Sequence, residues 1–299
     1  MPRLIINADD LGLTPGVNRA ILEAHQRGVV TSTTLMANSS AFDDAVQQVQ
    51  HAPKLSVGCH VMLVDGEPLS DPRPRTLARN GRFRDGIARF ALAAMRGRLD
   101  PEEIAAEATA QMRKLQAAGV TVSHLDTHKH THLFPAVLAP LLQAARACGV
   151  RAVRNPFAPL APLALAHLVK RPRLWTRYSE VRLLRRYSAE FRRLVAAAGM
   201  ATTDGTLGIV VTGRLDPALF EAIVGSLPEG GSDAPEGTSS KNTWEFVCHP
   251  GYPDADLDAV RTRLRQSRQQ ELELLTSPAA RQAIEAQGIE LISYRELGS

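Results

Sequence analysis

The densest group of reactive side chains lies between residues 123 and 132. This stretch holds four histidines and one aspartate at alternate positions, namely His124, Asp126, His128, His130 and His132. A single histidine is more often a core residue, and some histidine-rich runs are surface metal scavengers. Alternate positions share one side of an extended chain, so five such side chains in a row favour a metal or catalytic site.

Further acids and imidazoles stand at the ends of other apolar runs. Residues 4–8 lead into Asp9 and Asp10, residues 55–61 carry His60 near their end, and residues 244–250 carry His249 near theirs. One carboxylate and two imidazoles with open positions are typical of a catalytic metal site, where the pKa of bound water falls. A second carboxylate can then act as base and a histidine as acid.

Strands must position these side chains. The apolar runs predict eight of them, at residues 4–8, 29–36, 55–61, 120–125, 150–155, 207–213, 244–250 and 289–294. Helices are expected at about residues 15–27, 41–50, 101–118, 136–147, 219–227 and 266–275. This alternation predicts an α/β fold, a (β/α) barrel with seven or eight mostly parallel strands, formed by residues 1–299 as a single domain.

A parallel barrel gathers the carboxyl ends of its strands on one face, where active sites lie. We therefore expect the acid pair, His60, the His128 group and His249 to converge there. Thr14 and Pro15 are a good helix start, which leaves the two acids without a capping role. Adjacent residues point apart on an extended strand, so Asp9 and Asp10 can serve together only if the strand ends between them.

Composition limits the remaining choices. Cys59, Cys148 and Cys248 form no CxxC pair, which argues against a disulfide framework or a cysteine zinc site. With no apolar run long enough to span a bilayer and no signal peptide, we expect a cytoplasmic protein, with peripheral contact at the inner membrane face as a further hypothesis. Long loops are expected at about residues 65–86 and 229–240, as lids or disordered segments.

The formal net charge of +4 is unevenly distributed. A basic helical segment is predicted at about residues 164–197, and its part at 170–193 interleaves arginines with apolar side chains. Such a segment is either a solvated outer helix or a helix that lies on an anionic membrane. We expect no nucleic-acid partner, because no binding motif accompanies the basic run.

Several of these motifs resemble one known family. They are residues 7–12 (Asn-Ala-Asp-Asp-Leu-Gly), 58–60 (Gly-Cys-His), 124–132, 249–251 (His-Pro-Gly) and the closing 293–297 (Ser-Tyr-Arg-Glu-Leu). In this order they look like the YdjC family of carbohydrate deacetylases. The arginine-rich middle and residues 202–213 look more like the hopanoid-biosynthesis-associated branch than the chitooligosaccharide branch.

The resemblance implies a deformed barrel that removes an N-acetyl group from an amino sugar, such as an N-acetylglucosaminyl group on a hopanoid lipid. By position, Asp10, His60 and His128 are the implied metal ligands, Asp9 the base and His249 the acid. Asp126, His130 and His132 are expected in substrate contact or behind the ligands, with Asp126 orienting His128. One divalent ion is implied, zinc or magnesium first, then manganese, nickel or cobalt, and a homodimer is the expected assembly.

Two other functions fit the same residues. The barrel can instead hydrolyse phosphoesters or cyclic amides with its metal, and such an enzyme would ignore acetylated sugars. The chain can also be a non-catalytic sugar- or lipid-binding protein. The presence of both Asp9 and His249 counts against that last hypothesis.

Overall fold

A curled sheet of parallel strands forms the centre of the molecule. The computed structural model describes residues 1–159, 173–227 and 242–297. The sheet order is β6-β3-β2-β1-β8-β7, and β9 pairs with the start of β1. These strands are β1 (Arg3–Leu11), β2 (Ser32–Leu35), β3 (Ser56–Val61), β6 (Val122–Thr127), β7 (Gly205–Leu207), β8 (Thr243–Cys248) and β9 (Glu290–Leu291). The predicted α/β class is confirmed, with the sheet curled into a half-barrel.

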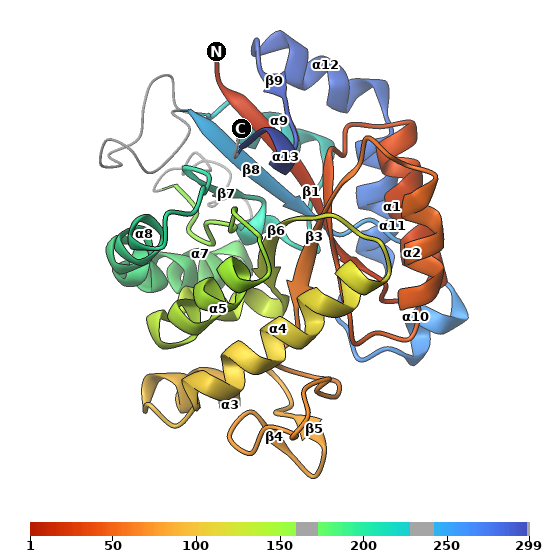
Figure 1. The fold of residues 1–299 in the computed structure, drawn as a ribbon. Coiled ribbons are helices and arrows are strands. Elements are labelled where there is room, and N and C mark those ends of the chain that lie inside the picture. Colours follow the sequence, from red (N-terminus) through yellow and green to blue (C-terminus); the bar gives the residue numbers. More distant parts are fainter. Residues whose placement is uncertain (160–172, 228–241, 298–299) are drawn as a thin grey trace.

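Helices cover the outside of this sheet. In Figure 1, α1 (Pro15–Gln26), α2 (Phe42–Gln50), α10 (Ala255–Ala259) and α11 (Gln266–Leu275) gather on one side. The other side carries α4 (Pro101–Ala117), α5 (Pro135–Ala147), α7 (Arg173–Leu184) and α8 (Ser188–Ala197). The remaining helices are α3 (Ile87–Met95), α9 (Pro217–Val224), α12 (Pro278–Ala286) and α13 (Tyr294–Leu297).

Four of the described helices start with a capping side chain followed by a proline. A side-chain oxygen accepts a backbone N–H of the first turn, and a proline follows it, at Thr14, Asp100, Asp216 and Ser277. The proline has no N–H to leave unsatisfied, and its φ already suits a helix. These caps set where α1, α4, α9 and α12 begin. The predicted start of the first helix at Pro15 is confirmed.

Three predicted strands are much shorter in the structure. The strand predicted at residues 289–294 keeps only Glu290–Leu291, because helix α13 begins at Tyr294. Residues 150–155 make only isolated bridges, from Val153 to Leu125 and from Ala152 to Ala201. The strand predicted at 207–213 ends at Leu207, because Gly208 adopts a φ of 90° and a 3₁₀ turn, η3 (Ile209–Val211), follows. The sheet is therefore open between β6 and β7, where the bridges replace a full strand.

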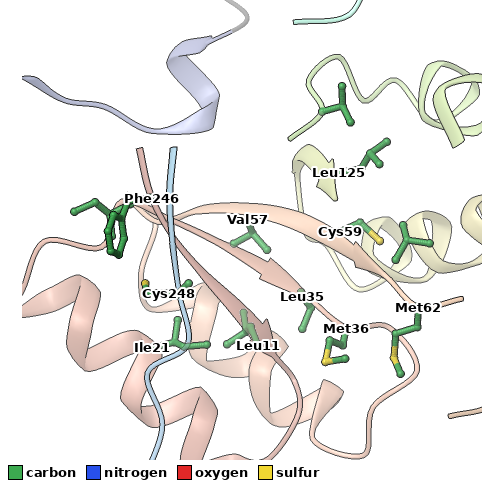
Figure 2. Packing of buried hydrophobic residues seen from close by; sticks show 14 of the residues in the cluster. Leu11, Ile21, Leu35, Met36, Val57, Cys59, Met62, Leu125, Phe246 and Cys248 are labelled. Atoms are coloured by element: carbon green, nitrogen blue, oxygen red, sulfur yellow. The ribbon is translucent and has the colours of Figure 1, made fainter. Parts of the chain in front are cut away.

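Side chains alternate between the two faces of the strands, as expected for a period of two. Leu4, Ile6 and Ala8 of β1 belong to the main core under the helices, whereas Ile5 belongs to a separate inner cluster. Figure 2 shows Cys59 and Cys248 within the main core, among leucines and methionines. Both thiols are fully buried, and burial raises their pKa well above the usual range, so they stay protonated and pack as apolar side chains.

The structure describes only parts of the two predicted long loops and the predicted basic segment. Residues 65–86 contain a short antiparallel hairpin, β4 (Ala78–Arg79) with β5 (Arg82–Phe83). Glu107 and Glu103 of α4 accept backbone N–H groups of the loop before this hairpin, from residues 69–70 and 75–76. The loop at 229–240 and residues 164–172 lie outside the described residues. From Arg173 to Ala197 the basic segment is not one helix but α7, a 3₁₀ turn η2 (Arg185–Tyr187) and α8.

Across the described ranges, no helix is both long and apolar enough to cross a bilayer. That residues 1–299 form one domain stays a prediction.

Candidate metal and catalytic centre

A bulge in β1 brings the two adjacent acids to the same site. Ala8 pairs with Thr33 and Leu11 with Leu35, so Asp9 and Asp10 together lie opposite the single residue Thr34. Asp10 has a φ of 70°, the left-handed conformation that bulged strands use to turn one side chain. Strand alternation alone would require the strand to end between the acids, but β1 continues past both of them to Leu11. The bulge meets the same demand, because it cancels the alternation that would point the carboxylates apart.

Three ligand-type atoms converge beside this bulge. Asp10 Oδ1 lies 3.5 Å from His60 Nε2 and 3.5 Å from His128 Nδ1, and the two nitrogens are 3.4 Å apart. Asp10 and His60 are buried, whereas His128 is partly open to solvent. The three residues come from β1, β3 and the 3₁₀ helix η1 (His128–Leu133) that follows β6. Segments far apart in the sequence thus meet in one triangle of donors, open on one side.

Asp126 orients His60. Its Oδ1 lies 2.7 Å from His60 Nδ1, and Thr34 Oγ1 lies 3.2 Å from the same nitrogen. The sequence prediction that Asp126 orients His128 is corrected here, because β3 and β6 pair His60 directly with Asp126. A bound cation would displace the proton of Nε2 and leave the other proton on Nδ1, where Asp126 holds it, so that Nε2 would face the ion. Burial lowers the pKa of His60, but Asp126, Asp9 and Asp10 outweigh burial and raise it to about 9.

Asp9 is clamped by a buried arginine. Arg154 donates Nη1 to Oδ2 at 2.8 Å and Nη2 to Oδ1 at 2.6 Å, and Asn7 Nδ2 donates to Oδ1 at 2.9 Å. Burial alone would raise the pKa of the Asp9 carboxyl, but Arg154 and His60 hold it well below its usual range. The oxygen Oδ2, with fewer donors, lies 3.9 Å from His249 Nε2. Asp9 is therefore an ionised, fixed carboxylate.

Helix α11 supports both Asp10 and His249. Arg268 donates Nη2 to Asp10 Oδ2 at 2.5 Å, which leaves Oδ1 to face the imidazoles. Burial works against ionisation of Asp10, yet Arg268 and His128 keep its pKa well below the usual value. Glu271, one turn along, accepts the backbone N–H of His249 at 2.6 Å. One helix thus fixes two site residues from strands β1 and β8.

The remaining histidines do not follow the predicted alternation. Lys129 and His130 both adopt positive φ, so the chain turns after Thr127 instead of continuing extended. His132 is buried, with Nδ1 2.7 Å from Thr127 Oγ1. Burial, followed by the charge of Arg154, lowers the pKa of His130 to about 3, so its ring is neutral. His124 lies deeper, stacked on Tyr294 with ring centroids 3.6 Å apart.

The donor set fits a divalent cation. Ligand atoms held about 2.0–2.1 Å from one zinc ion at tetrahedral angles lie ~3.4 Å apart, close to the 3.4 and 3.5 Å edges of this triangle. The buried carboxylates in these contacts are those of Asp9, Asp10, Asp126 and Glu245, and the buried guanidinium groups are those of Arg154 and Arg268. The carboxylates therefore outnumber the guanidinium groups by two. Once a bound cation has displaced the extra proton of His60, two negative charges are left in these contacts, and a divalent ion balances them.

Sequence reasoning missed the charged residues behind the ligands. Arg154 was detectable in part, because it ends the apolar run at 150–155, as the predicted ligands end theirs. Glu245 lies inside an apolar run, where the sequence gives it no evident role. Arg268 and Glu271 lie in the middle of a polar helix, where nothing in the sequence distinguishes them from surface residues.

Comparisons with known proteins give matches over nearly the whole chain. A sequence model of the family described as YdjC-like protein matches residues 3–286. A carbohydrate deacetylase of Brevibacillus brevis is 34% identical over 298 residues, covering 99% of this chain and 100% of the relative. A carbohydrate deacetylase of Geobacillus stearothermophilus is 32% identical over 298 residues, covering 99% of this chain and 98% of its own.

Solved structures share the fold. A protein of Enterococcus faecalis named for cellobiose-phosphate cleavage superposes with a TM-score of 0.72 at 26% identity, covering 99% of this chain and 98% of its own. A lactam utilization protein of Thermus thermophilus superposes with a TM-score of 0.50 at 16% identity, covering 97% of this chain and 99% of its own. At that identity the second likeness concerns the fold alone.

Proposed function

The chain belongs to the YdjC-like family, and from that premise we propose that it is a carbohydrate deacetylase that uses one divalent metal ion to hydrolyse the N-acetyl group of an amino sugar. The observation that carries this proposal is the triangle of Asp10, His60 and His128, with Asp9 and His249 beside it. Relatives at 34% and 32% identity that carry this activity by name support the reaction class.

Asp10, His60 and His128 would hold the ion. When bound, such a cation polarises the amide carbonyl and lowers the pKa of water. One carboxylate with two imidazoles suits zinc better than magnesium, which prefers oxygen ligands, so zinc is our first candidate. Magnesium, manganese, nickel and cobalt remain the alternatives to be compared in the assay.

Asp9 is the base in this proposal, and His249 is the acid. Asp9 Oδ2 accepts the proton of the attacking water, since it has one donor, Arg154 Nη1, whereas Oδ1 accepts from three, on Asn7, Thr34 and Arg154. Clamping by Arg154 makes Asp9 a weak base, which is adequate once the pKa of the water is itself lowered. His249 Nε2, 3.9 Å from Asp9 Oδ2, donates a proton to the departing amine. His130, His132 and Asp126 then serve as site walls and supports.

An N-acetylglucosaminyl group on a hopanoid lipid is the more specific substrate we propose. Support comes from the surface near the site. Apart from Met1, the exposed large apolar side chains of the described ranges belong to residues 69–95 and 175–183, namely Leu69, Ile87, Leu92, Met95, Trp175 and Leu183. Exposed arginines flank them, and α3 contacts η1 of the site. A basic apolar surface beside the site suits a substrate held in an anionic bilayer.

Acetate release tests the reaction. Purified protein with each divalent metal is incubated with N-acetylglucosamine, chitooligosaccharides and a glycosylated hopanoid, and acetate is measured. Metal-dependent release that falls at least ~10³-fold in His128→Ala and in Asp9→Asn supports the proposal. Turnover of phosphoesters or lactams without acetate release would overturn it. Light scattering of the same sample tests the predicted homodimer.

A further inference from the structure

A buried chain of hydrogen bonds runs from the C-terminal helix to the catalytic centre. Helix α13 contacts β6 and follows β9, which pairs with the start of β1, and in Figure 1 it lies close to the C-terminus. Tyr294, the first residue of α13, is 1% exposed and belongs to the inner cluster with Ile5 and Leu297. Its hydroxyl donates to Glu245 Oε2 at 2.6 Å. The aromatic ring fills the base of the half-barrel, while the hydroxyl points toward its polar interior.

Glu245 passes this contact on to Arg154. It is fully buried in β8, and its Oε1 accepts from Arg154 Nε at 2.8 Å and Nη2 at 2.6 Å. Its second oxygen accepts from Tyr294 and, at 3.2 Å, from Thr206. A buried carboxylate must be held at both oxygens to stay in one orientation. Tyr294 supplies the shorter of the two contacts to Oε2.

Arg154 is the branch point of the chain. The guanidinium that donates to Glu245 also donates the paired bonds to Asp9, and it makes an ion pair with Asp126. Asp126 in turn holds Nδ1 of His60. The orientation of one arginine therefore fixes both the proposed base and a proposed metal ligand. Because Arg154 lies on the irregular segment at 150–155, the backbone there supplies only isolated bridges to hold it.

We propose that Tyr294 is a positioning residue of the deacetylase site, acting through Glu245 and Arg154 on Asp9 and His60. This inference rests on the proposed function for the identity of the reaction, but the chain of contacts exists without it. It gives the closing residues 293–297 a role beyond packing. Loss of the hydroxyl frees one oxygen of Glu245, loosens the guanidinium, and misplaces two site groups that α13 never touches.

Tyr294→Phe is the direct test, because it keeps the ring that stacks on His124 and removes only the hydroxyl. We expect kcat for acetate release to fall roughly 10-fold with KM within about twofold of the wild type. Zinc affinity, measured by competition with a chromophoric chelator, should weaken about 3- to 10-fold through His60. The matched control is Tyr252→Phe, which removes another tyrosine–glutamate hydrogen bond, to Glu23 of α1, and should change neither quantity.

A double-mutant cycle separates positioning from packing. If Tyr294 acts through Glu245, the variant carrying Tyr294→Phe and Glu245→Gln should be no slower than Glu245→Gln alone. Additive losses in kcat would overturn the proposed route, as would a Tyr294→Phe protein with wild-type kcat and zinc affinity. A wild type that releases no acetate would defeat the proposed function only, since the zinc titration of the same variants still decides the positioning role.

Discussion

At the scale of single residues, the site depends on arginines that hold carboxylates in place. Arg154 and Arg268 are each at most 1% exposed, and each directs one carboxylate of the acid pair. A buried guanidinium is expensive to desolvate, and it persists only where several acceptors surround it. Arg154 has three such acidic partners, Asp9, Asp126 and Glu245. In the function we propose, the adjacent acids therefore have different tasks: Asp10 holds the ion, and Asp9 accepts a proton from the attacking water.

Replacement of Arg268 should weaken metal binding. In Arg268→Met, Asp10 Oδ2 loses its 2.5 Å partner, so the carboxylate is free to rotate away from the imidazoles. We expect the zinc affinity to fall about 10- to 100-fold, as for other residues that orient metal ligands. Competition with a chelator measures it. Arg265→Met, which removes a half-buried arginine paired with Asp258 just before the same helix, is the control and should leave the affinity unchanged.

At the scale of elements, the sequence predicts the regular parts and fails where the chain is irregular. The helix of Pro15 and the strands that end at His60 and His249 follow from periodicity and capping, so the convergence of the site residues could be predicted. The bulge at Asp10 could not, because a positive φ at an aspartate leaves no apolar pattern. The turn at Lys129 defeats simple alternation for the same reason, and it carries His130 and His132 away from the predicted row.

Helix α4 should control the order of the loop at 65–86. Glu107 is fully buried and accepts the backbone N–H groups of Leu69 and Ser70. In Glu107→Gln an amide NH₂ replaces one carboxylate oxygen and faces the backbone N–H groups, which are donors too. We therefore expect the free energy of unfolding to fall by roughly 2–3 kcal/mol. Amides 69 and 70 should also lose protection in hydrogen exchange. Glu103→Gln, which weakens the more exposed clamp on Thr76, should cost only about 1 kcal/mol.

Equal decreases in the free energy of unfolding for Glu107→Gln and Glu103→Gln would contradict the special role of Glu107. Faster exchange across the entire chain in Glu107→Gln would also contradict it, since that pattern reports global rather than local opening.

At the scale of the whole molecule, apolar and basic side chains gather at one place. Met95 of α3 contacts Arg186 of η2, so two segments about 90 residues apart form one surface. Its exposed arginines are Arg89, Arg96, Arg98, Arg182 and Arg186. A second copy of the chain would set arginines against arginines across a twofold axis, which disfavours dimerisation through this surface. An anionic bilayer complements both its charge and its apolar side chains.

Binding to vesicles should therefore depend on these arginines. Each basic side chain near an anionic surface contributes about 1 kcal/mol, so Arg182→Gln with Arg186→Gln should weaken binding to phosphatidylserine vesicles roughly 30-fold. Co-sedimentation at low and high salt measures this, and salt should weaken the wild type toward the variant. Arg27→Gln with Arg281→Gln removes the same charge from the end of α1 and the middle of α12, and should bind as the wild type does. If both double variants lose vesicle binding equally, the net charge of the protein rather than this surface drives the contact. Wild-type binding that is as strong on neutral vesicles as on phosphatidylserine vesicles would exclude an electrostatic contact.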